Sequence, residues 1–304
     1  MEISRRDFMK GLGITTGGLI LCNSSGLGKL DRAAYASSPG VAMLVDTSKC
    51  VGCWWCYAAC KQYNGFPETI KPDPEKSPEL APQTWSTLFP VEKNGEWHFR
   101  KQACMHCTEA ACVEVCPTGA LSYNSLGFVQ YERDLCSGCG YCTEFCPFGV
   151  PQLRSNKITT VGLMDKCTFC IDRVTNGQQT ACAEACPMDA IKFGKRPELL
   201  EEGKKRVAEL SKTNPQARLY GENEAGGLHV MYVLNDSPES CGLPVDPQLP
   251  AAVMVHDVLQ VAGYALAGLV VVGLGLNYVV ARTNTDKEAK AKAKANNRPK
   301  KTED

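Results

Sequence analysis

The sequence lacks an excess of either charge, since 33 basic and 33 acidic residues leave a formal net charge of zero over 304 residues. Nothing in the total charge therefore indicates a nucleic acid or another polyanion as a partner. A glycine-rich dinucleotide fingerprint is also missing, and no nucleophile stands in a recognisable pairing with a base. The sequence alone thus shows no catalytic apparatus.

Cysteine is abundant, with 18 residues, which is too many for buried packing alone. Such a number leaves disulfides, zinc or iron–sulfur clusters, and spacing has to decide between them. Sixteen of the cysteines fall into four motifs. Motif one is Cys50-x2-Cys53-x2-Cys56-x3-Cys60, motif two is Cys104-x2-Cys107-x4-Cys112-x3-Cys116, motif three is Cys136-x2-Cys139-x2-Cys142-x3-Cys146, and motif four is Cys167-x2-Cys170-x11-Cys182-x3-Cys186.

Motifs one and three match the bacterial ferredoxin run for [4Fe–4S] clusters, and Pro147 completes it in motif three. Pro117 and Pro187 follow motifs two and four, whereas Lys61 takes this place after motif one. Zinc sites need two C-x2-C units rather than runs that end in C-x3-C-P, so the spacing favours iron. A disulfide scaffold fits less well, and a [3Fe–4S] cluster would need a missing ligand.

The fourth cysteine of such a run ligates the other cluster of a pair. Nineteen residues separate Cys116 from Cys136, which fits one hairpin that turns at 124–127 between strands at 120–123 and 128–131. Motifs two and three should therefore form one module, and motifs one and four pair by elimination. The predicted ligand sets, which hold iron only, are set A (Cys50, Cys53, Cys56, Cys186), set B (Cys60, Cys167, Cys170, Cys182), set C (Cys104, Cys107, Cys112, Cys146) and set D (Cys116, Cys136, Cys139, Cys142).

Five other residues near or beyond the motifs invite a role. Trp54 and Trp55 are expected to shield a cluster or to pack at an interface. His106 is expected to form hydrogen bonds or to lie at the surface, because the cysteine count is complete without it. Lys166 either raises a nearby potential by its charge or is an ordinary solvated lysine. Cys241 stands alone and should be a small buried side chain.

The N-terminus reads as a targeting segment. Arg5 and Arg6 precede Phe8 and a weakly apolar stretch, and Ala34-Tyr35-Ala36 offers a cleavage site, which together indicate a twin-arginine export signal. The alternative is a chance pair of arginines. Cys22 lies inside this segment and is assigned no role. Because this route exports proteins with their cofactors already inserted, the cysteines would escape the disulfide formation that export normally implies.

Between and after the motifs, the pattern predicts few regular elements. The segment from Cys60 to Cys104 contains six prolines and is expected to run irregularly, over a partner surface or as a flexible loop. A short hairpin is expected at 92–100, turning at 94–95. Further on we expect a strand at 190–193, a helix that starts near Pro197 with Lys204, Lys205 and Arg206 late in it, and a strand at 228–234.

Residues 258–280 contain no charge and are long enough to cross a bilayer. A buried soluble helix is the alternative. No Lys or Arg occurs from Leu219 to Ala281, whereas eight follow from Arg282 to Lys301. Positive-inside logic places this basic tail, expected to be disordered, in the cytoplasm and the cluster domain outside. The chain would therefore be a single-pass protein at the periplasmic face of the bacterial inner membrane.

The expected fold class is α+β, with two ferredoxin-like two-cluster modules, one inserted in the other, and one C-terminal transmembrane helix. The expected division is a signal peptide at 1–36, a four-cluster domain at 37–195 with the inserted module at about 97–157, a bracing segment at 196–250, a transmembrane anchor at 251–281 and a basic cytoplasmic tail at 282–304.

Four cysteine motifs in this order, one with an x11 gap, resemble the iron–sulfur subunits of molybdopterin oxidoreductases. Residues 136–142, 166–173 and 227–234 are most similar to the beta subunit of respiratory formate dehydrogenase. The resemblance implies four [4Fe–4S] clusters, a molybdenum or tungsten pterin catalytic partner and a membrane cytochrome b, or other quinone-reactive subunit, as acceptor. It also pairs motif one with four and motif two with three.

On this reading the chain is an electron-transfer subunit with no catalysis of its own. Its partners would be the two other subunits and the lipid bilayer, without nucleic acid. One departure is the export signal, which in many such complexes lies on the catalytic subunit. The electron-transfer subunit of a periplasmic nickel–iron hydrogenase carries its own signal and is the alternative, beside another molybdopterin oxidoreductase. A self-sufficient enzyme and a soluble polyferredoxin are the readings from other classes.

Overall fold

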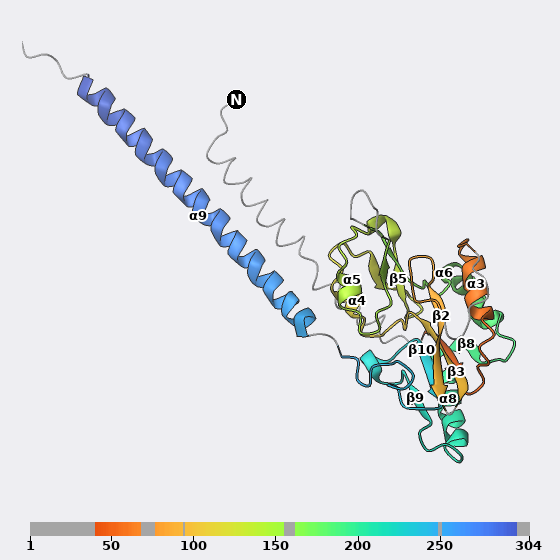
Figure 1. Cartoon of the computed structure of the whole chain (residues 1–304). Helices are drawn as coiled ribbons and strands as arrows, with labels where there is room; N and C mark the ends of the chain where they lie inside the picture. The colour runs from red at the N-terminus through yellow and green to blue at the C-terminus, as the bar shows by residue number, and fades with distance from the viewer. Residues whose placement is uncertain (1–39, 68–76, 94, 155–161, 249–250, 297–304) are drawn as a thin grey trace, which may run out of the picture. The chain divides into compact units, whose positions relative to one another are not determined.

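The chain divides into two compact units between Pro250 and Ala251, and each is described by itself. The computed structural model describes residues 40–67, 77–93, 95–154, 162–248 and 251–296 (Figure 1). The expected export signal, with Cys22, lies outside the described residues, and so does part of the proline-rich segment after motif one.

A four-stranded sheet with the order β8-β1-β10-β9 forms the centre of the first unit. β1 (Val41–Asp46) and β10 (Val230–Leu234) run parallel in its middle, while β8 (Ile191–Lys195) and β9 (Arg218–Tyr220) are its antiparallel edges. The middle strands are buried on both faces, which explains their nearly unbroken apolar sequences. The strands predicted at 190–193 and 228–234 are confirmed, whereas β1 was not predicted. The sheet thus joins strands from both sides of position 196, which is the predicted boundary between the cluster domain and the bracing segment.

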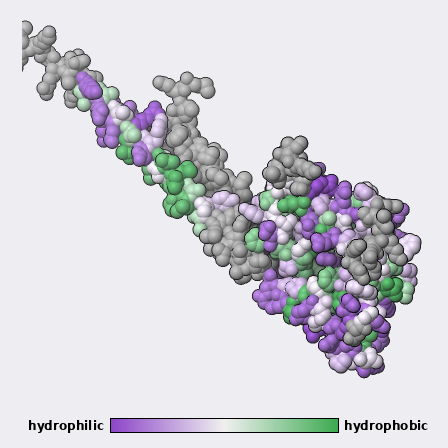
Figure 2. Space-filling view, in the orientation of Figure 1, coloured by the Kyte–Doolittle hydropathy of each residue, from purple (hydrophilic) through white to green (hydrophobic). Residues whose placement is uncertain are grey.

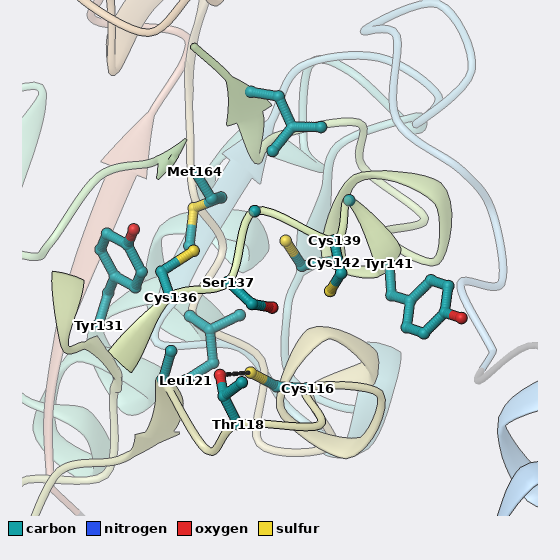
Figure 3. Close-up of a pocket in the computed structure, with 14 residues that line it drawn as sticks. Cys116, Thr118, Leu121, Tyr131, Cys136, Ser137, Cys139, Tyr141, Cys142 and Met164 are labelled. Atoms are coloured by element: carbon teal, nitrogen blue, oxygen red, sulfur yellow. Dashed lines mark hydrogen bonds between the residues drawn. The ribbon is translucent and has the colours of Figure 1, made fainter. Parts of the chain in front are cut away.

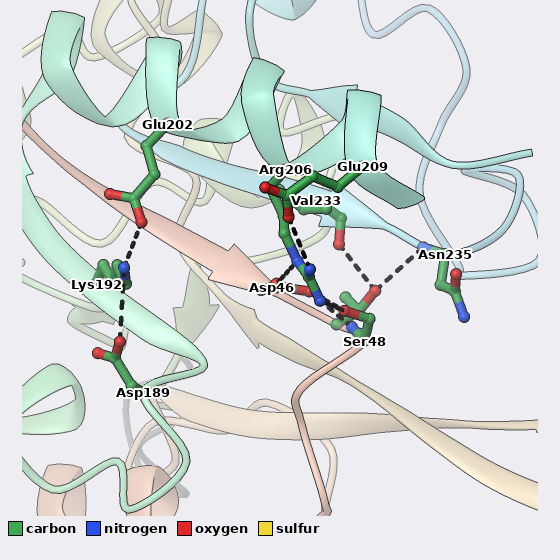
Figure 4. A network of polar contacts seen from close by, with 10 residues as sticks. Asp46, Ser48, Asp189, Lys192, Glu202, Arg206, Glu209, Val233 and Asn235 are labelled. Carbon is green, nitrogen blue, oxygen red and sulfur yellow. Dashed lines mark hydrogen bonds and ion pairs between the residues drawn. The ribbon is translucent and has the colours of Figure 1, made fainter. Parts of the chain in front are cut away.

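α8 (Arg196–Leu210) covers one face of this sheet, and its start beside Pro197 confirms the predicted helix. Two ion pairs join it to the sheet (Figure 4). Arg206 Nε donates to Asp46 Oδ2 at 2.9 Å, and Lys192 on β8 pairs with Glu202. The apolar layer between helix and sheet consists of Ala42, Leu44, Leu199, Met231 and Val233.

The helix α8 continues for one turn beyond Lys204, Lys205 and Arg206, which the sequence places late in it, and its last turn holds no basic residue. The reason is packing, because Val207 and Leu210 still contact the apolar layer over the sheet. Helix length here follows the sheet that it covers rather than the charge pattern.

A two-stranded ribbon carries the chain into motif two. β2 (Ser86–Lys93) pairs antiparallel with β3 (Glu96–Ala103), from Ser86 opposite Ala103 to Lys93 opposite Glu96. The predicted hairpin is confirmed, but it begins at Ser86 rather than at position 92, so the irregular path expected there is wrong. Pro90 is tolerated because each strand of a two-stranded ribbon keeps one unpaired edge.

The hairpin predicted between motifs two and three is confirmed. β4 (Leu121–Tyr123) pairs with β5 (Val129–Tyr131), and the turn closes where the Gly127 N–H donates to the Asn124 carbonyl at 2.8 Å. A short ladder of β6 (Gln152–Leu153) and β7 (Met164–Asp165) leads toward motif four.

A short helix carries the third cysteine of each motif. In motif one the helix also includes the fourth cysteine, whereas in the other three motifs it ends two residues before the fourth cysteine. The helices are α3 (Trp55–Tyr63), α4 (Ala111–Glu114), α5 (Tyr141–Glu144) and α7 (Ala181–Glu184), while α6 (Ile171–Thr175) and the 3-10 turns η2 (Arg133–Leu135) and η3 (Glu224–Gly226) lie elsewhere. α4 packs against α5 (Figure 1), and α3 packs against α7.

The second unit is one helix, α9 (Ala251–Asn296). Its stretch Ala262–Lys292 is long and apolar enough to cross a membrane, with a mean hydropathy of 1.9 in its best window and no burial against the protein. Figure 2 shows hydrophobic side chains gathered along part of it and hydrophilic ones nearer its far end. The helix includes 282–296, so the disordered tail is wrong for these residues, which are rich in the helix formers Ala and Lys.

Candidate iron–sulfur sites

Two hollows in the first unit are each bordered by four cysteines from two different motifs. The four thiols of set D line one hollow of about 340 Å3, counted out to solvent, and Figure 3 shows them around the same space. The thiols of set A line a second hollow of about 380 Å3. In each case a fourth cysteine joins three of another motif: Cys116 joins motif three, and Cys186 joins motif one.

Within set B, and likewise within set C, the thiols lie close enough together to change one another's pKa. Burial raises the pKa of Cys107 most, followed by the neighbouring Cys104, Cys112 and Cys146. This puts Cys146 of motif three beside three cysteines of motif two.

In set B, burial raises the pKa of Cys60, and the nearby thiols of Cys167, Cys182 and Cys170 raise it further. Cys60 of motif one is therefore grouped with three cysteines of motif four. Each of the four predicted sets is thus brought together in the first unit.

The electrostatic influence of one set on another follows a single order. After the larger effect of burial, Cys182 of set B raises the pKa of Cys56 of set A, Cys104 of set C raises that of Cys167 of set B, and Cys142 of set D raises that of Cys112 of set C. Sets A, B, C and D are therefore neighbours in that sequence, with A and D at the two ends.

Burial also determines the protonation of these thiols. It raises the pKa of Cys56, Cys142 and Cys170 to about 12. Such thiols stay protonated at neutral pH unless a metal supplies positive charge, since the thiolate is the metal ligand. All cysteines of the described residues are free. Within the same residues, no three His, Cys, Asp or Glu side chains converge on a point for a single metal ion, whereas the hollows accommodate a larger group.

The four motifs repeat one backbone turn two residues after their first cysteine. Gly52, His106, Gly138 and Phe169 stand there with φ of 67°, 48°, 70° and 60°. In each motif this residue's N–H points to the first cysteine's sulfur, for example from Phe169 to Cys167 Sγ at 3.5 Å. His106 and Phe169 adopt this left-handed conformation at a steric cost that glycine avoids. The shared loop shape fits a common ligand that needs inward N–H groups.

His106 departs from its prediction. The ring is fully buried, and neither nitrogen has a hydrogen-bond partner of good geometry among the described residues, so both expected roles are wrong. It packs edge-on to Phe128 and Phe169, with centroids 5.9 and 4.8 Å away. Buried nitrogens without a partner are rare, and a bound group beside Cys104 and Cys107 fits this one.

The other residues singled out divide between interior and surface. Trp54 is buried and borders the hollow of set A, whereas Trp55 is 60% exposed. Cys241 is buried, as predicted. Lys166 is 1% exposed, so the alternative of a solvated lysine is wrong.

Sequence reasoning missed Lys101, which borders the hollow of set A and is also 1% exposed. Its signal was available in the two-residue period of the strand, because Phe99, Lys101 and Ala103 share the buried face of β3.

Comparison with known proteins adds the family. Residues 49–120 and 95–196 each match the model of a 4Fe-4S dicluster domain. The chain is 37% identical over 265 residues to the formate dehydrogenase iron-sulfur subunit of Haemophilus influenzae, covering 82% of this chain and 83% of that protein. It is 37% identical over 257 residues to the nitrate-inducible formate dehydrogenase iron-sulfur subunit of Escherichia coli K12, covering 78% and 86%. The chain belongs to the formate dehydrogenase iron–sulfur subunits.

As a member of this family, the chain is an electron-transfer subunit, and its two dicluster domains hold four [4Fe–4S] clusters. The hydrogenase-2 operon protein HybA of Escherichia coli O157:H7 is also similar, at 33% identity over 285 residues, with 80% of this chain and 84% of that protein covered. The two domain matches overlap at 95–120 and do not distinguish nested from consecutive pairing of the motifs. Formate dehydrogenase is the best-supported complex.

Proposed function

We propose that this chain conducts electrons between two partner subunits of a formate dehydrogenase, with sets A to D as the cluster ligands. When bound, a cubane with four cysteine ligands supplies outer-sphere, one-electron transfer and leaves no iron open to substrate. The observation that carries the proposal is the grouping of all sixteen motif cysteines into four sets that adjoin one another in the order A, B, C, D.

The nested arrangement of the two modules is part of this proposal. It is supported by the contacts of the motif helices, because α3 of motif one packs on α7 of motif four and α4 of motif two packs on α5 of motif three. Exchange of the fourth cysteine within each pair, Cys60 for Cys186 and Cys116 for Cys146, fits these contacts. Residues 97–157 would then be the inserted module of a four-cluster domain at 37–195, braced by 196–250.

The chain's own residues ligate, insulate and orient rather than catalyse. Buried aromatic and aliphatic side chains such as Trp54, Phe99 and Phe128 exclude water from the sets. The inward N–H groups of the motif loops favour thiolates over thiols. A separate catalytic subunit with a molybdenum or tungsten pterin would then perform the chemistry on formate.

The membrane topology is likewise proposed. Export by the twin-arginine signal at 1–36 and a basic C-terminus after α9 both put the cluster unit in the periplasm and the tail at 282–304 in the cytoplasm. The exposed apolar side chains of α9, among them Leu266, Leu269 and Leu274, support a bilayer around the segment at 251–281. A membrane cytochrome b or another quinone-reactive subunit would be the acceptor.

Three measurements on the native complex test the proposal. Anaerobically purified protein should contain about sixteen irons per chain and no zinc, since each cubane holds four irons. Membranes washed with carbonate should retain the chain until detergent is added. A pterin-containing subunit that oxidises formate should co-purify.

The similarity to HybA favours one alternative, the electron-transfer subunit of a nickel–iron hydrogenase. A nickel-containing partner in the purified complex would support it over formate dehydrogenase. Colourless protein, or thiols oxidised in pairs, would contradict both.

A further inference from the structure

Two lysines of the cluster unit are almost completely buried and lack a carboxylate partner among the described residues. Lys101 and Lys166 are each 1% exposed, and no Asp or Glu of the described residues forms an ion pair with either. Burying an ammonium is unfavourable unless nearby negative charge and hydrogen bonds compensate for it. The groups around each lysine should therefore include those that carry the compensating negative charge.

Lys101 points from β3 toward sets A and B. Its Nζ donates to Ser86 Oγ at 2.7 Å, and the side chain borders the hollow of set A. Burial lowers its pKa, but the neighbouring Cys182, Cys56 and Cys167, whose thiolate forms a bound cluster would stabilise, outweigh this effect and raise the pKa above the usual value. The ammonium thus faces one cysteine of set A and two of set B.

Lys166 holds the corresponding position beside set C. Its Nζ donates to the carbonyls of Val129 and Cys167, at 3.0 Å each, which fixes the ammonium in the interior. Its charge opposes the burial that raises the pKa of Cys104 and of Cys112. Two hydrogen bonds to neutral carbonyls orient this cation but do not neutralise it.

Among the described residues, set D has no such lysine. The residues that line its hollow include Ser137, Thr118 and Tyr131 but no basic side chain. Arg133 is near Cys136 but is 43% exposed and already paired with Asp165. Solvent and this carboxylate screen its charge, so set D differs from the other three.

We propose that Lys101 and Lys166 set the reduction potentials of the clusters held by sets A, B and C, and that set D is without this control. The inference rests on the proposed function, since it requires clusters in these sets. Reduction adds one electron, and hence one negative charge, to a cluster. A fixed ammonium at short range in a poorly solvated interior stabilises this added charge and makes reduction easier.

The test is an EPR-monitored titration of the purified complex with dithionite as reductant and ferricyanide as oxidant. Lys101→Gln, which keeps a hydrogen-bond donor near Ser86, should move two of four reduction steps to lower potential. A tenfold fall in the equilibrium constant for reduction appears as about 59 mV. Lys166→Gln should move a third step that Lys101→Gln leaves in place, and one step should move in neither.

Lys195→Gln is the matched control, because Lys195 lies on β8 of the same unit with 75% of its side chain exposed. It should leave all four steps in place. The proposal is overturned if the lysine variants keep their iron and move no step, if all four steps move alike, or if both variants move the same steps.

If Lys101→Gln loses iron, Lys101→Arg shows whether the loss comes from the missing positive charge or from the changed shape of the side chain. Recovery of iron and potentials in the arginine variant supports the proposal, and continued loss overturns it. The wild-type complex distinguishes this failure from that of the proposed function. Fewer than four reduction steps in the wild type would contradict the proposed function. Four steps that no lysine variant moves would contradict the lysine proposal alone.

Discussion

The sheet side and the hairpin side of the cluster unit use the same cysteine spacing in different surroundings. The sheet side, made of motifs one and four against β8-β1-β10-β9, places set A beside the buried Trp54 and Lys101. The hairpin side, made of motifs two and three with β4 and β5, ends at set D. Cys56 is fully desolvated and has a raised pKa. At Cys136 the effect of burial is outweighed by hydrogen bonds from the Met164 and Gly138 N–H groups, which lower the pKa.

The difference teaches that cysteine spacing selects the cofactor, while the surrounding side chains decide its electrostatic environment. It also predicts that the two sides contribute unequally to the stability of the unit. The main core of the unit includes Cys56 and Cys182, whereas a smaller core of a few side chains, with Cys142, supports the hairpin side. Variants of similar residue types on the two sides can sharpen or break this comparison.

The largest effect is expected from the third cysteine of motifs one and three. Cys56→Ser and Cys142→Ser should each remove about four irons per chain, because each deletes one ligand of a cubane. The free energy of unfolding should fall by more than about 4 kcal/mol for Cys56→Ser and by about half as much for Cys142→Ser, whose core is smaller. Iron analysis and thermal unfolding measure both. Cys241→Ser, outside the motifs, should keep all the iron. Equal losses of unfolding free energy in Cys56→Ser and Cys142→Ser would contradict the comparison.

Next are two loop glycines with positive φ. A Cβ at Gly52 (φ +67°) would lie 2.3 Å from the Phe99 ring, whereas at Gly140 (φ +81°) its nearest neighbour is a Leu153 methyl at 3.2 Å. Gly52→Ala should therefore lower stability by about 3 kcal/mol, from backbone strain and overpacking. Gly140→Ala should lower it by about 1 kcal/mol, from strain alone. Thermal unfolding compares the two, and a larger loss at Gly140 would contradict the comparison.

A buried carboxylate contributes to the hairpin side. The Asp165 side chain has no exposure and pairs with Arg133 at 2.9 Å and Arg154 at 3.0 Å. Asp165→Asn should destabilise the protein by about 2 kcal/mol, since two charge-assisted hydrogen bonds lose their acceptor charge. Glu184→Gln, which breaks an exposed pair with Arg173, should change stability by less than about 0.5 kcal/mol. If both variants lowered the free energy of unfolding in urea equally, Asp165 would contribute no more to stability than Glu184 does.

The smallest effect concerns pH at the junction of the two sides. His229 binds the Val41 carbonyl through Nδ1 at 2.6 Å, and a Cβ at Gly127 would meet its ring. Burial lowers the pKa of His229 to about 4, below its ordinary value of about 6.5. The unfolded chain therefore binds the proton first as pH falls below 6.5, and this contribution to stability declines until pH 4.

From pH 7 to pH 5.5 the loss should be about 1 kcal/mol in the wild type. His229→Gln, which retains a donor for the Val41 carbonyl, should lose correspondingly less over this interval. Unfolding midpoints measured at both pH values give the slope. An unchanged slope in the variant would remove His229 as its source.

Local elements were largely predictable. The hairpin at 120–131, the strands β8 and β10 and the start of α8 follow from turn residues, alternation and Pro197, which act within a few residues. β1 was missed because its apolar run becomes a strand only between β8 and β10, both distant in sequence. The burial of His106 was missed for the same reason, whereas that of Lys101 was available from the alternation along β3.

The sequence by itself determined the cofactor class, because the distances between cysteines within a motif are set by a few covalent bonds and by helix pitch. It also determined the charge-free stretch at 258–280 that is long enough to cross a bilayer. Only the tertiary structure decided in which order the four sets adjoin and which charges face them. Those relations depend on packing between distant segments, as between Cys56 and Cys182, and no local pattern encodes the dielectric environment that such packing creates.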